Sequence, residues 1–445
     1  MIACCLKQIY PVNTSVIKNS LLILPKKVNH FIIDTLLNKK KIINDPLYGL
    51  ITIPSELIFD LIEEPFFQRL RRIKQLGLTE YVYPGANHTR FHHAIGAMHL
   101  MGLALDSLRQ KGVEISNEEY EAAQVAILLH DIGHGPFSHS LEHNLLHEVE
   151  HEEVSLSIIE LLNKKYQGAL SLAIHIFKNE YSRQFFHQLV SSQLDVDRLD
   201  YLSRDSFFTG VSEGTVGVDR IIKLIQVHDD QLVVEEKGIY SLENFLSARR
   251  LMYWQVYFHK TTVGIEKLLV QMITRAKHLT WKGEEVPASA SLRLFLQKEI
   301  SLADIKSNTI YLQAFQNLDD FDVWTAIKSW CNHTDPILSL ISKMILNRNL
   351  FKVKLSARKP EKADIINFKQ QLMQKEGLSK EAHHYLVLHG SMSNAAYISG
   401  GQRINVLTKN GDIEDIARLS DLPNIKAMRK IVKKFYLCWP KSLSL

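Results

Sequence analysis

The stretch AILLHDIGHGPFSH, residues 126–139, decides the fold of this chain. A hydrophobic run ends in it at an adjacent histidine and aspartate, His130 and Asp131, and polar, titratable or helix-breaking residues follow. Two neighbouring residues of a helix point about 100° apart around its axis. At a helix end, where the backbone loosens, an imidazole nitrogen and a carboxylate oxygen can still converge on one cation. The stretch therefore predicts half of a metal site.

Two other stretches offer the second half of the site. TRFHHAIG contains His92 and His93, and SSQLDVDRLDYLSRD contains Asp195, Asp197 and Asp200. Three carboxylates so close together on one helix cannot all point the same way, so some of them are expected to cap the helix or to orient the ligands. A set of two His and two Asp suits iron, manganese, magnesium or zinc without selecting among them.

The order of several motifs along the chain carries a family resemblance. The blocks are NDPLYGLI (44–51), FFQRLRRIKQLG (66–77), PGANHTRFHHAIG (84–96), HDIGHGPFSH (130–139), EHEE (150–153) and DVDRLDYLSRD (195–205). This H…HD…D arrangement resembles the HD-domain metal-dependent phosphohydrolases, and within them the deoxynucleoside triphosphate triphosphohydrolases of the SAM-and-HD-domain type, in a bacterial form without the SAM domain. The resemblance implies a mainly α fold, with an HD-domain helical core and a small α+β C-terminal appendage.

The same resemblance assigns roles at the reaction centre. The implied metal ligands are His93, His130, Asp131 and Asp197, and His92 is the close competitor of His93. The implied catalytic residues are His134, His139 and His151, since histidine exchanges protons near neutral pH. The resemblance implies that His139 and His151 contact the α-phosphate or protonate the leaving oxygen, and that His134 is a closer neighbour of the metal. Glu142 stands where the family often has Asp, which leaves open whether a proton passes through this carboxylate.

The resemblance also implies substrate contacts. The negative charges of a triphosphate favour a cluster of cationic side chains. A tyrosine ring packed under C2′ leaves no room for a 2′ hydroxyl, and an amide and a carboxylate hold the 3′ hydroxyl. Arg198 replaces a lysine that is common in the animal relatives. The implied triphosphate contacts are Arg90, Arg198, Arg249 and Lys260, the sugar contacts are Gln75, Tyr201 and Asp205, and Tyr257 lies beside the sugar or base.

A second group of residues resembles the family's regulatory nucleotide site, which lies between subunits and stabilises a tetramer. Its members here are Lys41, Asn44, Glu63, Gln68 and Arg71. Glu63 replaces a shorter Asp, which affects base recognition there. The alternative is an ordinary charged surface, as most charge runs are. The resemblance thus predicts a homo-oligomer, tetramer or dimer, that takes deoxynucleoside triphosphates as substrates. Nucleic-acid binding is not indicated.

Composition sets limits on the protein class. The chain has 445 residues and a net charge of +5, which suits a locally held anion better than the coating of nucleic acid. Its cysteines, Cys4, Cys5, Cys331 and Cys438, form no CxxC pair, so a reducing cytoplasm is expected. The longest apolar run near the N-terminus, residues 21–24, is too short for a signal sequence or a membrane span.

The expected organisation has three parts. Residues 1–36 form an N-terminal extension, either disordered or untranslated if translation starts near Leu37; residues 37–280 form the HD phosphohydrolase core; and residues 281–445 form a helical and α+β region. The pattern predicts a strand at 50–53, a helix that starts at Pro54 and Ser55, and a helix over 66–77. It also predicts a hairpin in QLVVEEKGIYS (231–241), a long helix over 242–279, and short strands in KVKL, HYLVLHG and INVLT after Phe351.

Three functional classes remain open from the sequence. The leading hypothesis is a metal-dependent triphosphohydrolase, dGTPase-like, that releases a deoxynucleoside and triphosphate and is activated by nucleotide. The second is another HD-type phosphodiesterase or nucleotidase. It is disfavoured because Gln75, Tyr201 and Asp205 fit a nucleoside sugar. The third is a nucleotide-sensing module with vestigial activity, against which the intact ligand set argues.

Overall fold

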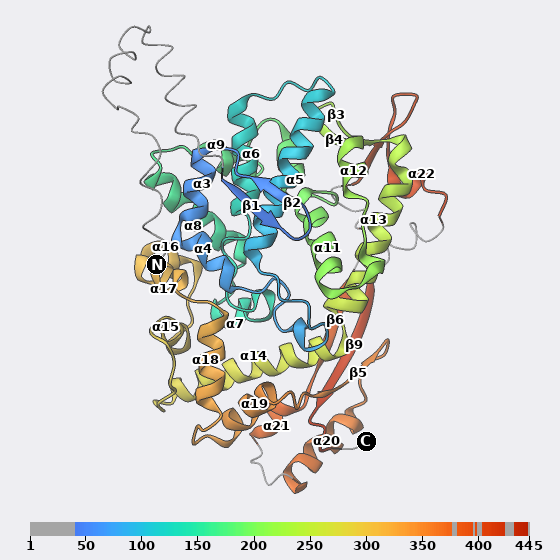
Figure 1. The fold of residues 1–445 in the computed structure, drawn as a ribbon. Coiled ribbons are helices and arrows are strands. Elements are labelled where there is room, and N and C mark those ends of the chain that lie inside the picture. The colour runs from blue at the N-terminus through green and yellow to red at the C-terminus, as the bar shows by residue number, and fades with distance from the viewer. Residues whose placement is uncertain (1–40, 376–380, 395–396, 398–402, 423–430, 444–445) are drawn as a thin grey trace, which may run out of the picture.

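The computed structural model describes residues 41–375, 381–394, 397, 403–422 and 431–443. The predicted extension over 1–36 and the start site near Leu37 lie outside these residues. The described chain is mainly α, as predicted, with three small sheets (Figure 1). Among the described residues, no helix combines the length and the apolar character that crossing a membrane requires.

The centre of the fold is α5 (Arg90–Gln110), which packs against α6 (Asn117–Leu129) and α11 (Val196–Thr209). Helix α6 is buried nearly all round, as its continuous apolar run predicts. Local capping fixes where these helices begin: Ser116 and Glu119 form a capping box on α6, and the Asp195 side chain caps α11. Because α6 and α11 begin and end at fixed residues, His130 and Asp197 are placed at helix ends that face α5.

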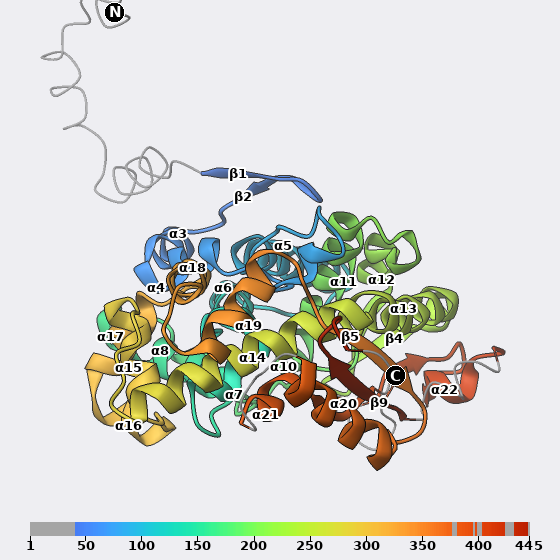
Figure 2. The same ribbon diagram turned by 90° about the horizontal axis from the view of Figure 1, so that it is seen from below.

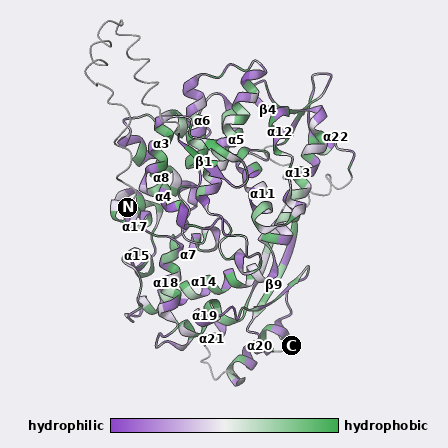
Figure 3. Cartoon of the chain, viewed as in Figure 1, coloured by the Kyte–Doolittle hydropathy of each residue, from purple (hydrophilic) through white to green (hydrophobic). Residues whose placement is uncertain are grey.

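Shorter helices surround this centre, and the long α14 (Lys260–Trp281) crosses beneath it (Figures 1 and 2). Hydrophobic and hydrophilic residues alternate along α14 and α18 (Asp320–Trp330), as expected for helices with one buried face (Figure 3). The remaining helices are α3 (Glu56–Glu63), α4 (Pro65–Gln68), α7 (Glu142–Leu145), α8 (His151–Lys165), α9 (Ser171–Phe177), α10 (Gln184–Val190), α12 (Val218–Leu224), α13 (Ile239–Met252), α14 (Lys260–Trp281), α15 (Ala290–Gln297), α16 (Leu302–Ser307), α17 (Thr309–Gln316), α18 (Asp320–Trp330), α19 (Pro336–Leu346), α20 (Lys362–Lys375), α21 (Ala382–Leu386) and α22 (Ile416–Leu419).

The strands form a hairpin and two larger sheets. The hairpin pairs β1 (Ile42–Asp45) with β2 (Gly49–Thr52), close to the strand predicted at 50–53. A four-stranded sheet has the order β3 (Ile225–His228), β4 (Gln231–Glu235), β7 (Asn405–Leu407) and β8 (Ile413–Asp415), and a three-stranded sheet has the order β5 (Lys352–Ser356), β9 (Val432–Trp439) and β6 (Leu388–Asn394). Because β7 pairs in parallel with β4, residues on both sides of position 280 share one sheet. The division into domains at that position stays a prediction.

The prediction of one helix over 66–77 is wrong after Gln68, where α4 ends. After α4 the chain makes a 3₁₀ turn over Arg69–Arg72, and Ile73 is extended, with φ −117° and ψ 114°. The carbonyl of Ile73 accepts from the amide of Arg90 at 2.9 Å, and Lys74 forms a bridge with Thr89. Backbone bonds to a distant segment therefore replace the bonds that would have continued the helix.

Two further predictions need correction. The long helix expected over 242–279 is two helices, α13 and α14, separated by a π-helical turn at Tyr253–Tyr257 and by an extended His259 that caps α14. The hairpin expected within 231–241 lies earlier: it is β3 and β4, and it turns at Asp229 and Asp230, which both have positive φ. Aspartate tolerates this left-handed conformation better than most residues. The sequence pattern alone did not identify Asp229 and Asp230 as a turn.

The contact between α5 and α11 generates a stability prediction. A Cβ atom on Gly96 would lie 2.1 Å from both the Arg204 guanidinium and the Asp200 carboxylate, which are buried. We expect Gly96→Ala to lower the free energy of unfolding by about 1–3 kcal/mol through overpacking, measured by chemical denaturation. Gly217→Ala is the control, because nothing lies within 4 Å of a Cβ at Gly217 and its φ is −78°. Equal losses in the two variants would contradict the prediction.

Candidate active site

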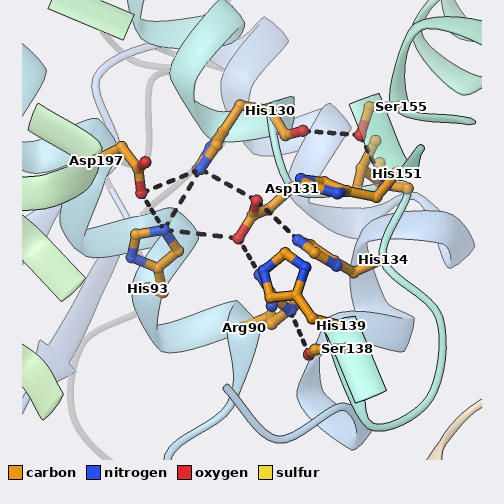
Figure 4. Close-up of polar contacts among 12 residues, drawn as sticks. Arg90, His93, His130, Asp131, His134, Ser138, His139, His151, Ser155 and Asp197 are labelled. Carbon is orange, nitrogen blue, oxygen red and sulfur yellow. Dashed lines mark hydrogen bonds and ion pairs between the residues drawn. The ribbon is translucent and has the colours of Figure 1, made fainter. Parts of the chain in front are cut away.

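The four residues predicted as metal ligands converge (Figure 4). The Nε2 atom of His93, in the first turn of α5, lies 3.4 Å from Nε2 of His130 and 3.1 Å from Oδ1 of Asp197. Oδ1 of Asp131 lies 3.3 Å from Nε2 of His130, and Oδ2 lies 3.6 Å from Nε2 of His93. Ligands bound at about 2.1 Å on perpendicular axes would lie about 3 Å apart, so the donor atoms of His93, His130 and Asp197 fit one divalent cation. Asp131 borders this group with a different oxygen toward each imidazole.

Hydrogen bonds on the far side of each imidazole turn the Nε2 atoms toward the centre. The Nδ1 atom of His130 lies 2.6 Å from the Ile127 carbonyl oxygen, and Nδ1 of His93 lies 2.7 Å from Oδ2 of Asp200. Such partners place the ring proton on Nδ1 and leave Nε2 to bind a cation. Burial lowers the pKa of His93, but its bonds to Asp197 and Asp200 outweigh burial and raise the pKa to about 10. The carboxylates around His93 thus favour positive charge at this point.

The neighbouring polar residues that compete for the ligand role have other partners. The His92 ring lies 3.0 Å from the Thr89 hydroxyl and completes a capping box at the start of α5. Asp195 accepts from the amide of Arg198 at 2.8 Å and caps α11, and Asp200 binds both His93 and Arg204. The two flanking aspartates therefore cap and orient, as the sequence predicts.

A cavity of about 450 Å³ adjoins the four converging residues. It brings together most of the predicted catalytic and substrate-binding residues, which come from the segments around α5, α6, α8 and α11 and from the turn before α14. The predicted residues in its lining are Gln75, Arg90, Asp131, His134, His139, His151, Asp197, Arg198, Tyr201, Asp205 and Tyr257.

Two predicted triphosphate contacts do not line this cavity. Arg249 is buried and its Nη1 donates to the Gln193 side chain at 3.2 Å. Lys260 is exposed and lines a separate hollow with Lys352 and Thr261. Their contact with a substrate stays a prediction.

The three predicted catalytic histidines form a compact cluster. The rings of His134 and His151 stack with centroids 3.7 Å apart, and the His139 ring meets both edge-on. Glu142 accepts from Nδ1 of His139 at 2.9 Å and from Nδ1 of His151 at 2.7 Å. Burial raises the pKa of Glu142, but these bonds outweigh it and hold the pKa well below its usual value. Glu142 is therefore an ionised carboxylate that orients both rings.

His134 differs from the other two histidines. It is 1% exposed, and burial together with the charge of Arg90 holds its pKa well below the usual value, so the ring is neutral near pH 7. Its Nε2 lies 3.3 Å from Oδ1 of Asp131. A neutral ring is a poor acid, whereas the His139 side chain is 69% exposed and faces the cavity. Of the three, His139 is the most exposed, and His151, which is 15% exposed, also lines the cavity.

Cations and polar groups continue along the cavity. Arg90 contacts Asp131 and donates from Nε to the Ser138 hydroxyl at 2.8 Å, which fixes its guanidinium. Among the residues predicted to contact the sugar, Asp205 accepts from the Tyr257 hydroxyl and from the His88 ring, each at 2.7 Å. The Oε1 atom of Gln75 is buried without a hydrogen-bond partner among the described residues. An amide left in this state suits a ligand donor.

The residues of the predicted regulatory site lie along the segment from the start of β1 to the 3₁₀ turn after α4. Lys41 Nζ lies 3.5 Å above the Phe59 ring. The Arg71 guanidinium lies 3.5 Å above the Phe91 ring and donates to Gln68 at 2.9 Å. Asn44 and Glu63 are exposed.

The sequence did not point to several residues that line the cavity. Glu266, on α14, is the most notable, because burial raises its pKa to about 7. It lies far along the chain from the HD motif, and no local pattern distinguishes it. The other unpredicted lining residues are Leu76, Gly77, Thr79, Phe137, Ser138, Ser140, Glu152, Tyr253 and Phe258.

Comparison with known proteins identifies matching families and relatives. Residues 90–205 match the model of the HD domain, and residues 216–295 match the model of the HD associated region. The uncharacterized protein YwfO of Bacillus subtilis is 32% identical over 421 residues, which cover 92% of this chain and 94% of that protein. The crystal structure of a phosphohydrolase from Bacteroides thetaiotaomicron is 51% identical, with a TM-score of 0.87, over 91% of this chain and all of that chain.

Some relatives have a named activity. The deoxynucleoside triphosphate triphosphohydrolase SAMHD1 homolog of Dictyostelium discoideum is 34% identical over 258 residues, which cover 53% of this chain. Deoxynucleoside triphosphate triphosphohydrolase SAMHD1 of Bos taurus is 29% identical over 361 residues, which cover 70% of this chain. The chain spans 49% and 58% of the length of these two relatives.

The geometry of the four converging residues predicts metal loss on substitution. We expect His130→Ala or Asp131→Ala to lose bound metal and to lower turnover at least about a hundredfold, because each removes a ligand while most of the core is unchanged. Metal content is measured by mass spectrometry and folding by circular dichroism. His92→Ala is the control, since His92 caps α5 and should not affect metal content. Full metal content and activity in His130→Ala would contradict the assignment.

Proposed function

This chain belongs to the HD-domain phosphohydrolase family, and we propose that it hydrolyses deoxynucleoside triphosphates to a deoxynucleoside and inorganic triphosphate. One observation carries the proposal: a single cavity is lined by metal-type donors, by arginines, and by the Tyr201 and Asp205 side chains. The named activity of the SAMHD1 relatives supports it.

The metal site completes the proposed chemistry. A divalent cation, Mn, Fe, Mg or Zn, held by His93, His130, Asp131 and Asp197 would neutralise phosphate charge and activate water. Arg90 and Arg198, both in the cavity lining, would hold the phosphates by forked hydrogen bonds. His139 would protonate the departing 5′ oxygen, and Glu142 would hold its ring in the required orientation.

Discrimination against ribonucleotides would come from the packing around the sugar. The Tyr201 and Tyr257 rings meet edge to face with centroids 6.3 Å apart, and the Tyr257 hydroxyl donates to Asp205. These contacts would hold Tyr201 against the sugar, where it would leave no space for a 2′ hydroxyl. Gln75 and Asp205 would bind the 3′ hydroxyl.

We expect the purified enzyme with manganese to release triphosphate from deoxynucleotides, at rates several orders of magnitude above those with ribonucleotides. Anion chromatography of the products separates triphosphate from pyrophosphate and orthophosphate, which another HD phosphodiesterase or nucleotidase would release. Tyr201→Ala should reduce the preference for deoxynucleotides over ribonucleotides, because it opens space for a hydroxyl at C2′. Equal rates with GTP and dGTP in the wild type would contradict the sugar assignment.

We also propose that the residues around Arg71 bind a nucleotide between subunits and promote an oligomer. The guanidinium of Arg71 and the ammonium of Lys41 lie on aromatic rings and are not joined to a carboxylate by any ion pair among the described residues, so they are available to an anion. A ligand shifts assembly only through different affinities for the two states.

Titration with dGTP or dATP should therefore raise both the mass and the initial rate in the wild type. Light scattering measures the mass, and triphosphate release from a second nucleotide measures the rate. Arg71→Ala should lose both responses while it keeps its metal. A wild type of fixed mass and unchanged kinetics would contradict regulation and leave the hydrolase proposal intact.

A further inference from the structure

Asp320, the first residue of α18, joins two segments of the cavity wall that are distant in sequence. Its Oδ2 accepts from the backbone amide of Lys74 at 2.9 Å, and its Oδ1 accepts from the backbone amide of Phe137 at 2.8 Å. Gln75 and Ser138, the next residues along the chain, both line the cavity. The Ser138 hydroxyl also donates to the Lys74 carbonyl at 3.3 Å, so the two segments are tied directly as well.

The turn that Asp320 binds has an unfavourable backbone. Phe137 and Ser138 have φ of 54° and 52°, in the left-handed region that residues with a side chain rarely adopt. Such a conformation persists only when surrounding contacts impose it. The residue after this turn is His139, so the turn determines where that imidazole lies.

The segment that carries Asp320 is also held against the loop that follows α6. The buried Arg69 donates to the Leu318 carbonyl at 3.0 Å and to the carbonyls of Ile132 and His134 at 2.9 and 2.8 Å. Arg72 forms an ion pair with Asp319. Residues 318–320 thus contact both segments at fixed positions.

The energetics of Asp320 point to a role beyond packing. It is 3% exposed, and no cation forms an ion pair with it among the described residues. A buried carboxylate held by backbone amides alone is costly, and burial raises its pKa to about 7. An apolar residue would pack here without that cost, but it would leave two buried amides without acceptors.

We propose that Asp320 is a positioning residue: it fixes the turn at Phe137 and Ser138 so that His139 and Gln75 face the substrate. The catalytic consequence rests on the proposed function. The structural consequence does not, because the turn is held whether or not the cavity hydrolyses nucleotides. The C-terminal half of the chain thereby contributes to the geometry of the reaction centre.

Hydrogen exchange tests the structural consequence directly. In Asp320→Ala, and in Asp320→Asn in case the alanine variant does not fold, amide exchange should accelerate in peptides that cover residues 72–77 and 135–141. Asp335→Asn is the matched control, since Asp335 is a buried carboxylate that caps α19 and pairs with Arg275 away from the cavity. It should lower stability without changing exchange in those peptides. Unchanged exchange in the folded Asp320 variants would overturn the proposal.

Kinetics test the catalytic consequence. Asp320→Ala should lower kcat about tenfold to a hundredfold, as misplacement of a reacting group by about 1 Å does. In a His139→Ala background the same substitution should change kcat less than about twofold, because the imidazole that Asp320 positions is gone. KM should rise in both backgrounds, because the loss of Asp320 displaces Gln75 in both. Equal losses of kcat in both backgrounds would overturn the role through His139. If the wild type hydrolyses no nucleotide, the proposed function fails, and the exchange result still decides the positioning role.

Discussion

A row of buried charges holds the fold and the reaction centre together. Asp45 in the β1–β2 hairpin pairs with Arg204 at 2.8 Å, Arg204 pairs with Asp200 at 2.9 Å, and Asp200 holds His93 at 2.7 Å. All four side chains are buried, and any one left unpaired would cost several kcal/mol. The hairpin, α11 and α5 must therefore lie together in one arrangement. Gly96 permits it, because only a residue without a side chain leaves room for the Asp200 and Arg204 pair.

Asp131 connects the candidate metal site to the cations of the cavity. Burial raises the pKa of this carboxyl, but the charges of His130 and Arg90 outweigh burial and hold the pKa well below its usual value. One oxygen faces His130 and His134, and the other contacts Arg90 (Figure 4). Since one carboxylate orients both the donor set and an arginine, a change at either part is transmitted to the other.

The sequence predicts those parts of the site that depend on local chemistry. Helix ends place His130 and Asp197, whereas the choice of His93 over His92 came from the family resemblance. The structure shows that His92 completes a capping box with Thr89 at the start of α5. Long-range contacts decide the rest. The helix over 66–77 fails because Ile73 bonds to Arg90, and the local pattern contains no sign of this pairing. Glu266 lines the cavity, and Asp320 binds the backbone of two segments of its wall, both from parts of the chain where no motif indicates function.

Glu142 stands where the related enzymes often have Asp, and its contacts show what the longer side chain does. Its Oε1 accepts from both the backbone amide and the Nδ1 atom of His151, each at 2.7 Å, while Oε2 accepts from His139. The longer side chain allows one carboxylate to bridge two rings on separate segments, so the extra methylene does not interrupt the contact with either ring. His134 stacks on His151 and is closed to solvent. The three rings consequently pack as one cluster, in which His139 is the most exposed member.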